Sequence, residues 1–263
     1  MAFIPIHLTM NKKELKNFLD EKAIQYENPD FIPHDPIQIP HRFEKKEDVE
    51  IAAFLTATIA WGNRKSIITN ATKLMNIMGN EPHEFILNYH PDQAECFTGF
   101  VHRTFNELDV ETFIRSLQHI YHNHNGLEAL FASGITKEGL QPAISHFKEV
   151  FFEVPHLQRT QKHVSDPLRN SAAKRINMFL RWMVRDAKAG VDFGIWKNIS
   201  PSLLSCPLDV HTGNVGRKLK LLSRKQNDAK SLAQLDASLR KLDPKDPVKY
   251  DFALFGLGAF EGF

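Results

Sequence analysis

Cysteine is rare in this 263-residue sequence, which contains only Cys96 and Cys206. The two are far apart and neither belongs to a CxxC pair, so the chain lacks the four thiolates of an iron–sulfur cluster or a zinc ribbon. Two isolated cysteines do not make a disulfide framework either, which favours a reducing compartment. We therefore expect no iron–sulfur cluster, no other cofactor and a cytoplasmic location.

Long hydrophobic runs are missing as well. No stretch reaches the ~18 apolar residues of a membrane helix, and the start, MAFIPIHLTMNKKELK, lacks the apolar core of a signal peptide. The formal net charge is only +2, because 33 lysines and arginines face 31 acidic residues. The composition predicts a protein with no membrane partner, in which any anion-binding surface is a local patch.

Strand signals are also scarce, since no Val/Ile/Thr-rich alternation lasts and no Asn-Gly or Asp-Gly turn separates two such runs. Helical periodicity covers nearly the whole chain and predicts an all-α fold. The segment 27–43 contains four prolines, which exclude one continuous helix and predict an extended strap. We predict helices at residues 11–26, 46–61, 64–78, 81–89, 109–123, 126–132, 137–151, 171–188, 210–222, 228–241 and 247–258.

The end of the helix 46–61 carries a group of polar and aromatic side chains. The helix is apolar on nearly every face from residue 51 to 60, as in a buried central helix. Gly62 and Asn63 then end it, with Trp61, Arg64 and Lys65 nearby. Two interpretations remain open: a capped end with a packed aromatic ring, or a stacking aromatic beside groups that face a nucleic-acid base and its phosphates.

The helix 171–188 is amphipathic, and one stripe along it is purely cationic. Lys174, Arg181, Arg185 and Lys188 fall opposite the apolar side, which is typical of a solvated face and also suits a phosphate backbone. Ser171 or Asn170 is a good N-cap residue and places Lys174 in the first turn. The positive end of the helix dipole there disfavours the charged amine, and a neutral lysine amine is a nucleophile.

The stretch CPLDVHTGNVGRKLKLL, residues 206–222, places Asp209 before a basic segment. The residue is suited to capping the helix through backbone N–H groups, and its carboxylate is equally suited to act on a substrate. The cations Arg217 and Lys218 follow. Gly213 and Gly216 lack side chains, which allows either a phosphate or another helix to approach closely.

These residues carry a resemblance to a known superfamily. PLDVHTGNVGRKLKLL (207–222) resembles the Pro-Asp-His segment that precedes a basic helix in helix–hairpin–helix DNA glycosylases. FLTATIAWGNRKSI (54–67) is similar to the buried early helix of that superfamily, and KYDFALFGLGAF (249–260) to its late helix. The arrangement is most similar to the cluster-free archaeal type of 8-oxoguanine DNA glycosylase. The whole chain also resembles a bacterial family described only as a domain of unknown function.

The resemblance implies one compact helical unit of two lobes, residues 45–170 and residues 1–44 with 171–263, that grips DNA in a groove and flips out a base. It implies base-excision repair of a damaged purine such as 8-oxoguanine by a monomer acting on damaged or abasic duplex DNA. Asp209 would assist loss of the base, and Lys174 would form a Schiff base with the sugar, giving AP lyase activity. The expected nucleic-acid contacts are Trp61, Asn63, Arg64, Arg181, Arg185, His211, Gly213, Arg217 and Lys218.

One part of the superfamily pattern is missing from the sequence. The segment 188–206 contains no Leu-Pro-Gly-(apolar)-Gly hairpin. Lys174 and Asp209 are also farther apart along the sequence than in the usual hairpin arrangement of the superfamily. Lys188 and Lys197 are therefore alternative nucleophiles. A non-enzymatic protein that binds DNA or RNA on a glycosylase-like scaffold is the alternative function.

The motif HIYHNHN groups His119, His122 and His124. The i, i+3 pair of His119 and His122 has the spacing of two metal ligands, but no nearby carboxylate completes a recognisable set. We expect no metal site and regard a helical metal-dependent hydrolase as the weakest alternative.

Overall fold

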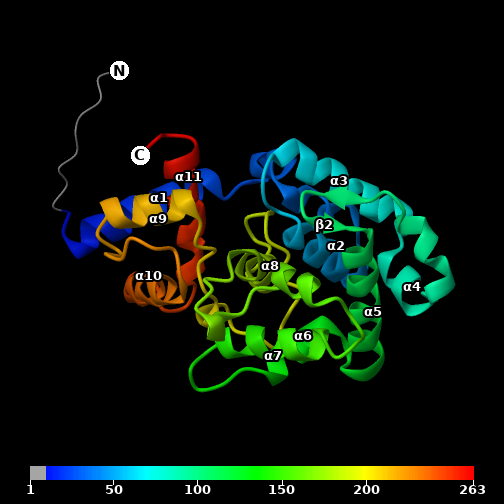
Figure 1. Cartoon of the computed structure of the whole chain (residues 1–263). Coiled ribbons are helices and arrows are strands. Elements are labelled where there is room, and N and C mark those ends of the chain that lie inside the picture. The colour runs from blue at the N-terminus through cyan, green and yellow to red at the C-terminus, as the bar shows by residue number, and fades with distance from the viewer. Residues whose placement is uncertain (1–9) are drawn as a thin grey trace.

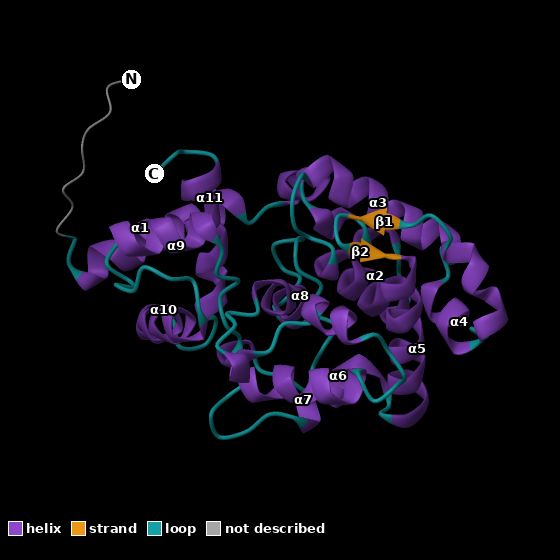
Figure 2. Ribbon diagram, viewed as in Figure 1, coloured by secondary structure: helices purple, strands orange, loops and turns teal. Residues whose placement is uncertain are grey.

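A computed structural model describes residues 10–263, which form a compact packing of helices (Figures 1 and 2). The mostly helical fold is confirmed, and each predicted helix corresponds to one in the structure. The helices are α1 (Lys12–Tyr26), α2 (Lys46–Thr58), α3 (Arg64–Ile77), α4 (Pro82–Leu87), α5 (Glu107–Asn123), α6 (Gly126–Ser133), α7 (Gln141–Phe151), α8 (Lys174–Val184), α9 (Val210–Lys218), α10 (Ala229–Leu242) and α11 (Tyr250–Ala259). Two short antiparallel strands, β1 (Val101–His102) and β2 (Phe105–Asn106), form a hairpin before α5.

None of the helices in residues 10–263 combines the length and the apolar character that crossing a membrane requires. The prolines of segment 27–43 exclude an α-helix there, as expected, but the segment is not extended. It forms three 3-10 turns, η1 (Pro29–His34), η2 (Pro36–Gln38) and η3 (Pro40–Arg42). A proline opens each turn, where its missing N–H is not needed for a helical hydrogen bond.

Two hydrophobic cores organise the chain. The larger core contains the apolar faces of α2 to α8 together with the strap residues Ile37 and Ile39. The smaller core is built from α1, α9, α10 and most of α11. Although the sequence grouped residues 171–263 with the second lobe, α8 lies in the larger core, where Phe179, Trp182 and Met183 are fully buried.

α11 belongs to both cores. Phe252 packs in the larger core, whereas Ala253, Leu254 and Leu257 lie in the smaller one. α1 lies beside α11 (Figure 1), and Gly256 leaves the space that the Tyr26 ring occupies, since a Cβ there would come within 2.1 Å of that ring. α11 therefore holds the two cores together.

Candidate functional site

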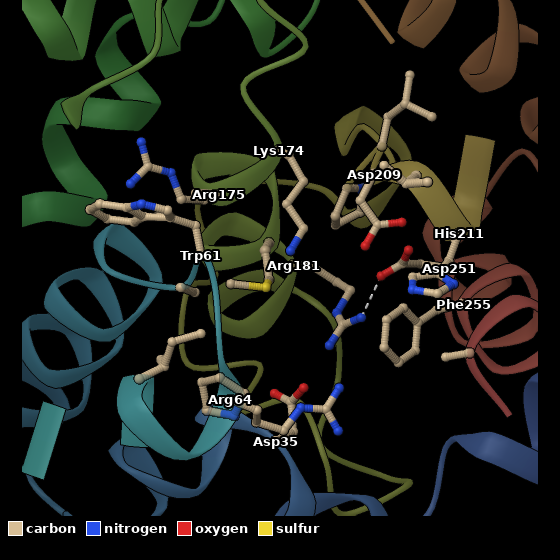
Figure 3. A pocket seen from close by; sticks show the side chains of 18 of the residues that line it. Asp35, Trp61, Arg64, Lys174, Arg175, Arg181, Asp209, His211, Asp251 and Phe255 are labelled. Carbon is tan, nitrogen blue, oxygen red and sulfur yellow. Dashed lines mark hydrogen bonds and ion pairs between the residues drawn. The ribbon is translucent and has the colours of Figure 1, made fainter. Parts of the chain in front are cut away.

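A cavity of about 770 Å³ lies where segments from both cores meet (Figure 3). Its volume falls within the range of small-molecule sites, about 300–1,000 Å³. Six segments contribute its walls: the strap, the turn from α2 into α3, α8, the residues around the start of α9, the loop before α10, and α11. The polar and aromatic side chains among them are Phe31, Asp35, Trp61, Arg64, Lys174, Arg175, Arg181, Asp209, His211, Asn227, Asp251, Phe252 and Phe255.

Lys174 is the first residue of α8 and projects into this cavity (Figure 3). The expected cap at Ser171 or Asn170 is wrong: the helix begins after Ala173, which has a left-handed backbone with φ of 44° and no capping side chain. Such a conformation costs about 1–2 kcal/mol for a residue with a Cβ. The Ser171 hydroxyl accepts a hydrogen bond from the Ala173 N–H at 3.1 Å and helps to hold this turn. The strained turn sets the direction of the Lys174 side chain.

Asp209 lines the same cavity and is the N-cap of α9, as predicted. Its Oδ1 accepts a hydrogen bond from the Thr212 N–H at 2.9 Å, and its carbonyl oxygen accepts one from Asn227 at 2.8 Å. No residue in the described part of the chain donates a hydrogen bond to Oδ2. One carboxylate oxygen thus fixes the helix start, and the other faces the cavity with the Lys174 amine (Figure 3).

Asp251, which the sequence reasoning missed, is a buried carboxylate that lines the cavity with the half-buried Asp209. It accepts a hydrogen bond from Arg181 at 2.6 Å across the boundary between α11 and α8. Burial raises the pKa of Asp251, against the charge of Arg181, and the negative charge of Asp209 raises this pKa further. The start of α11 gave no sequence signal for this role, because a first-turn aspartate is commonly a helix-dipole residue.

The expectation of an exposed cationic stripe on α8 is wrong for its two arginines. Arg181 and Arg185 are each only 5% exposed. Arg181 contacts Asp192 and Asp251, at 3.3 and 2.6 Å. Asp192 lies in the loop after α8, and Asp251 lies in α11. These two segments cover the face of α8 that the sequence periodicity had predicted to be exposed to solvent.

Arg185 follows the last residue of α8 and lies away from the cavity wall. It forms ion pairs with Glu27 at 2.6 Å, Asp192 at 2.8 Å and Asp246 at 2.8 Å. Burial alone would lower its pKa, but Asp246 and Asp192 raise it well above the usual range. The guanidinium is fully engaged within the protein, so the expected phosphate contact is corrected to a structural role.

Trp61 forms an aromatic wall of the cavity, and Arg175 fixes it in place. The Arg175 guanidinium lies 4.7 Å from the Trp61 ring centroid, while the His102 ring meets the indole edge-on at 5.0 Å. Arg175 donates hydrogen bonds to the carbonyl oxygens of Thr58 and His163. It forms no ion pair with a carboxylate within residues 10–263, and burial lowers its pKa to about 10. Arg175 was absent from the predicted site, although it adjoins Lys174 in the sequence.

The other two residues expected at the turn after α2 have different roles: Arg64 lines the cavity, and Asn63 caps a helix. Arg64 is exposed, lines the cavity and lies on the same side as Asp35 (Figure 3). Burial raises the pKa of Asp35, in opposition to the charges of Arg181, Arg64 and Lys174. Asn63 lies outside the cavity and caps α3 through a 3.1 Å hydrogen bond from the Ser66 N–H.

His211 is exposed at the rim and meets the Phe255 ring edge-on at 5.9 Å. It reaches this place because Gly258 of α11 has no side chain: a Cβ there would come within 2.9 Å of His211. The absence of a Cβ lets the start of α9 approach α11 closely. The cavity rim on this side therefore depends on Gly258.

The basic end of α9 has a different role from the expected phosphate contact. Gly213 is buried against the side chains of Asn227 and Arg217, which a Cβ would meet at 2.7 and 2.8 Å. Arg217 donates to the carbonyl oxygens of Arg224, at 2.6 Å, and of two residues that follow, and so holds the loop before α10. Gly213 therefore allows close packing, and Arg217 stabilises the loop before α10. Lys218 remains exposed.

Neither alternative nucleophile lies in the cavity. The Lys188 side chain is 89% exposed and faces Asp186, and the exposed Lys197 donates its amine to the carbonyl oxygen of Gly194. Between α8 and α9 the chain forms one 3-10 turn, η7 (Pro201–Leu203), and no helical hairpin. Lys174 is the lysine that the fold brings to the cavity with Asp209.

A second cavity of about 640 Å³ adjoins the first, and Phe31 and Arg64 line both. Its walls add the aromatic rings of Tyr26 and Phe260 and the exposed cation Lys65. Both cavities are thus lined by aromatic and cationic side chains.

The fold and site define a mostly helical protein with a charged cavity between two hydrophobic cores. The chain belongs to the family described as "Protein of unknown function (DUF2400)", whose family model matches residues 35–260. Comparison with curated proteins and with solved structures gives no match.

Proposed function

We propose that the protein is a DNA glycosylase with lyase activity, which removes a damaged base held in the cavity between the two cores. One observation carries the proposal: Lys174 and Asp209 come from different segments, yet both line one cavity with Trp61 and Arg64. An amine, a carboxylate, an aromatic face and an exposed cation are groups suited to base removal through a lysine nucleophile.

The chemistry assigns Lys174 as the nucleophile. Its amine forms a bond to C1′ of the sugar as the bond from C1′ to the base breaks, and the base leaves with the electron pair and takes up a proton. The bond between C1′ and the ring oxygen then opens as one proton of the attached amine passes to that oxygen, which gives a protonated Schiff base on Lys174 and a hydroxyl group on the opened sugar. The covalent intermediate divides one difficult displacement into two easier steps.

Asp209 stabilises the positive charge that develops on the sugar as the base departs. A carboxylate acts strongly in a site with little water, because low dielectric strengthens its field. The neighbouring pair of Asp251 and Arg181 supplies a buried wall that fixes the cavity beside Asp209. Trp61 is suited to stack on the extruded base, and Arg64 and Lys65 to contact phosphates along the adjoining cavity.

Borohydride trapping on duplex DNA with an abasic site tests the lyase step. The Lys174 Schiff base, formed there from the aldehyde with loss of water, is reduced to a stable adduct that shifts the protein on a denaturing gel. We expect an adduct with the wild-type chain and with Lys188→Ala and Lys197→Ala, and none with Lys174→Ala. An adduct that survives Lys174→Ala contradicts the assignment, and absence of any wild-type adduct overturns the lyase activity.

A second candidate function is non-enzymatic binding of DNA or structured RNA on this scaffold. It is favoured by the segment between α8 and α9, which contains no helical hairpin to bind the phosphate backbone. Binding of lesion-bearing DNA that persists in Asp209→Asn, without base release by the wild type on purine and pyrimidine lesions, would support this alternative.

A further inference from the structure

A cluster of two histidines and one glutamate lies at the C-terminal end of α5, and none of its members lines the cavity. His119 lies in the last turns of α5, His124 is the residue that ends this helix, and Glu153 follows α7. Each side chain offers a ligand atom, and these atoms all lie within 4.8 Å of one another. The carboxylate that the sequence motif lacked is thus supplied by a distant segment.

The end of the helix brings the two imidazoles together. Residues five positions apart on a continuous α-helix lie about 140° apart around the axis, so His119 and His124 would not face each other. α5 ends at Asn123, and His124 leaves the helical path while its N–H still bonds to the Ile120 carbonyl at 2.9 Å. The two rings then lie 5.2 Å apart at 61°. The sequence had paired His119 with His122, which is exposed and takes no part in the cluster.

His119 and Glu153 already contact each other, since Nε2 of the imidazole lies 2.9 Å from Oε2 of the carboxylate. A simple hydrogen bond would explain that pair, but it leaves unexplained why a second imidazole turns toward both. Two imidazoles and a carboxylate are a donor set suited to zinc and related transition-metal ions. Ligand bonds of about 2.0–2.2 Å need only small side-chain rotations, which the partly exposed His119 and Glu153 side chains permit.

We propose that His119, His124 and Glu153 bind one divalent transition-metal ion, such as Zn²⁺, that ties the end of α5 to the segment after α7. His119 coordinates through Nε2, the atom that faces Glu153. The fourth position, on the solvent side, is open to water. The site is separate from the cavity, so its success or failure is independent of the proposed base chemistry.

Asn123 is the neighbour that this coordination must move. Its amide nitrogen lies 3.0 Å from Nδ1 of His119 and 3.0 Å from the His119 carbonyl oxygen. Coordination through Nε2 leaves the imidazole proton on Nδ1, so Asn123 must turn its amide oxygen toward that nitrogen. A carboxylate at this position would accept the proton directly and increase the basicity of the ligand.

Titration of the metal-free full-length chain with Zn²⁺, followed by calorimetry, tests the site. We expect one strong binding event, weakened at least tenfold in His119→Ala, His124→Ala and Glu153→Gln. The matched control is His122→Ala, which removes an exposed histidine of the same helix and should leave the affinity unchanged. Because the chain has 13 histidines, this comparison separates the cluster from scattered weak binding.

A second variant tests the coordinating atom. Asn123→Asp should tighten Zn²⁺ binding severalfold, and weaker binding in that variant contradicts coordination through Nε2. Wild-type affinity in His119→Ala, or an equal loss in His122→Ala, overturns the site. Circular dichroism of each metal-free variant checks that the fold is retained.

Discussion

Arg181 shows how one buried side chain shapes the cavity wall. Its guanidinium bridges α8 and α11, with Asp251 at 2.6 Å on one side and Asp192 at 3.3 Å on the other, and it lies 4.2 Å from the Phe252 ring centroid. Burial lowers the pKa of Arg181, but Asp192 and Asp251 raise it further, so the side chain stays charged. Its charge is therefore balanced within the protein and is not free to neutralise a phosphate.

Removal of the Asp251 carboxylate, which pairs with Arg181, should lower the free energy of unfolding. Asp251→Ala leaves a buried guanidinium with only Asp192, so we expect a loss of about 3 kcal/mol in the free energy of unfolding. Denaturant unfolding followed by circular dichroism measures this loss. Asp186→Asn is the control, because Asp186 and Lys188 form an exposed pair whose loss changes stability by no more than about 0.5 kcal/mol. Equal effects of the two variants would contradict a structural role for the Arg181 pair.

The individual site residues were predictable to different degrees. Asp209 follows from local sequence, since a cap is set by the residues next to it. Asp251 and the burial of Arg185 depend on which segments pack against α8 and α11, and these contacts join residues some 60–70 positions apart. No periodicity within one helix contains that information.

At the scale of elements, the start of α9 combines two functions in one carboxylate. Oδ1 of Asp209 caps the helix, and the rest of the group faces the cavity. The two functions can be separated, because asparagine caps a helix as well as aspartate does but carries no charge.

Two substitutions at Asp209 should therefore have different effects on stability but the same effect on activity. Asp209→Asn should keep the free energy of unfolding within about 0.5 kcal/mol, whereas Asp209→Ala should lose about 1 kcal/mol with the cap. Both should abolish base release, as measured by single-turnover cleavage of lesion-bearing DNA. If Asp209→Asn retained full activity, the carboxylate would have no electrostatic role.

The helices themselves were well predicted, because apolar periodicity is a local property of each segment. Their ends were less so. The predicted helix 171–188 begins at Lys174 and ends at Val184, since the left-handed Ala173 and the extended Arg185 interrupt it. The Ser171 hydroxyl helps to hold the Ala173 turn, and Arg185 is held by Glu27 and Asp246 from distant segments. Apolar periodicity reports neither contact, so the predicted helix was too long at both ends.

At the scale of the whole molecule, the two cores differ in size. α2 is buried on every face from Val49 to Thr58 and lies in the larger core, whereas α10 packs only one face against the smaller core. Regions with fewer buried apolar contacts open at lower free energy.

Amide hydrogen exchange should reveal this difference. We expect the backbone of α10 to exchange at least tenfold faster than that of α2 under native conditions, as measured by mass spectrometry of peptides from each helix. Exchange of both helices at one common rate would indicate that the two cores unfold only together.

The position of the cavity has a practical consequence, because its walls include α8 from the larger core and α9 from the smaller one. A small molecule lodged there touches both cores at once and favours the assembled chain by mass action. Free nucleobases and nucleosides could accordingly be ranked by the rise in melting temperature that each produces, in a screen that needs neither strand scission nor a labelled oligonucleotide.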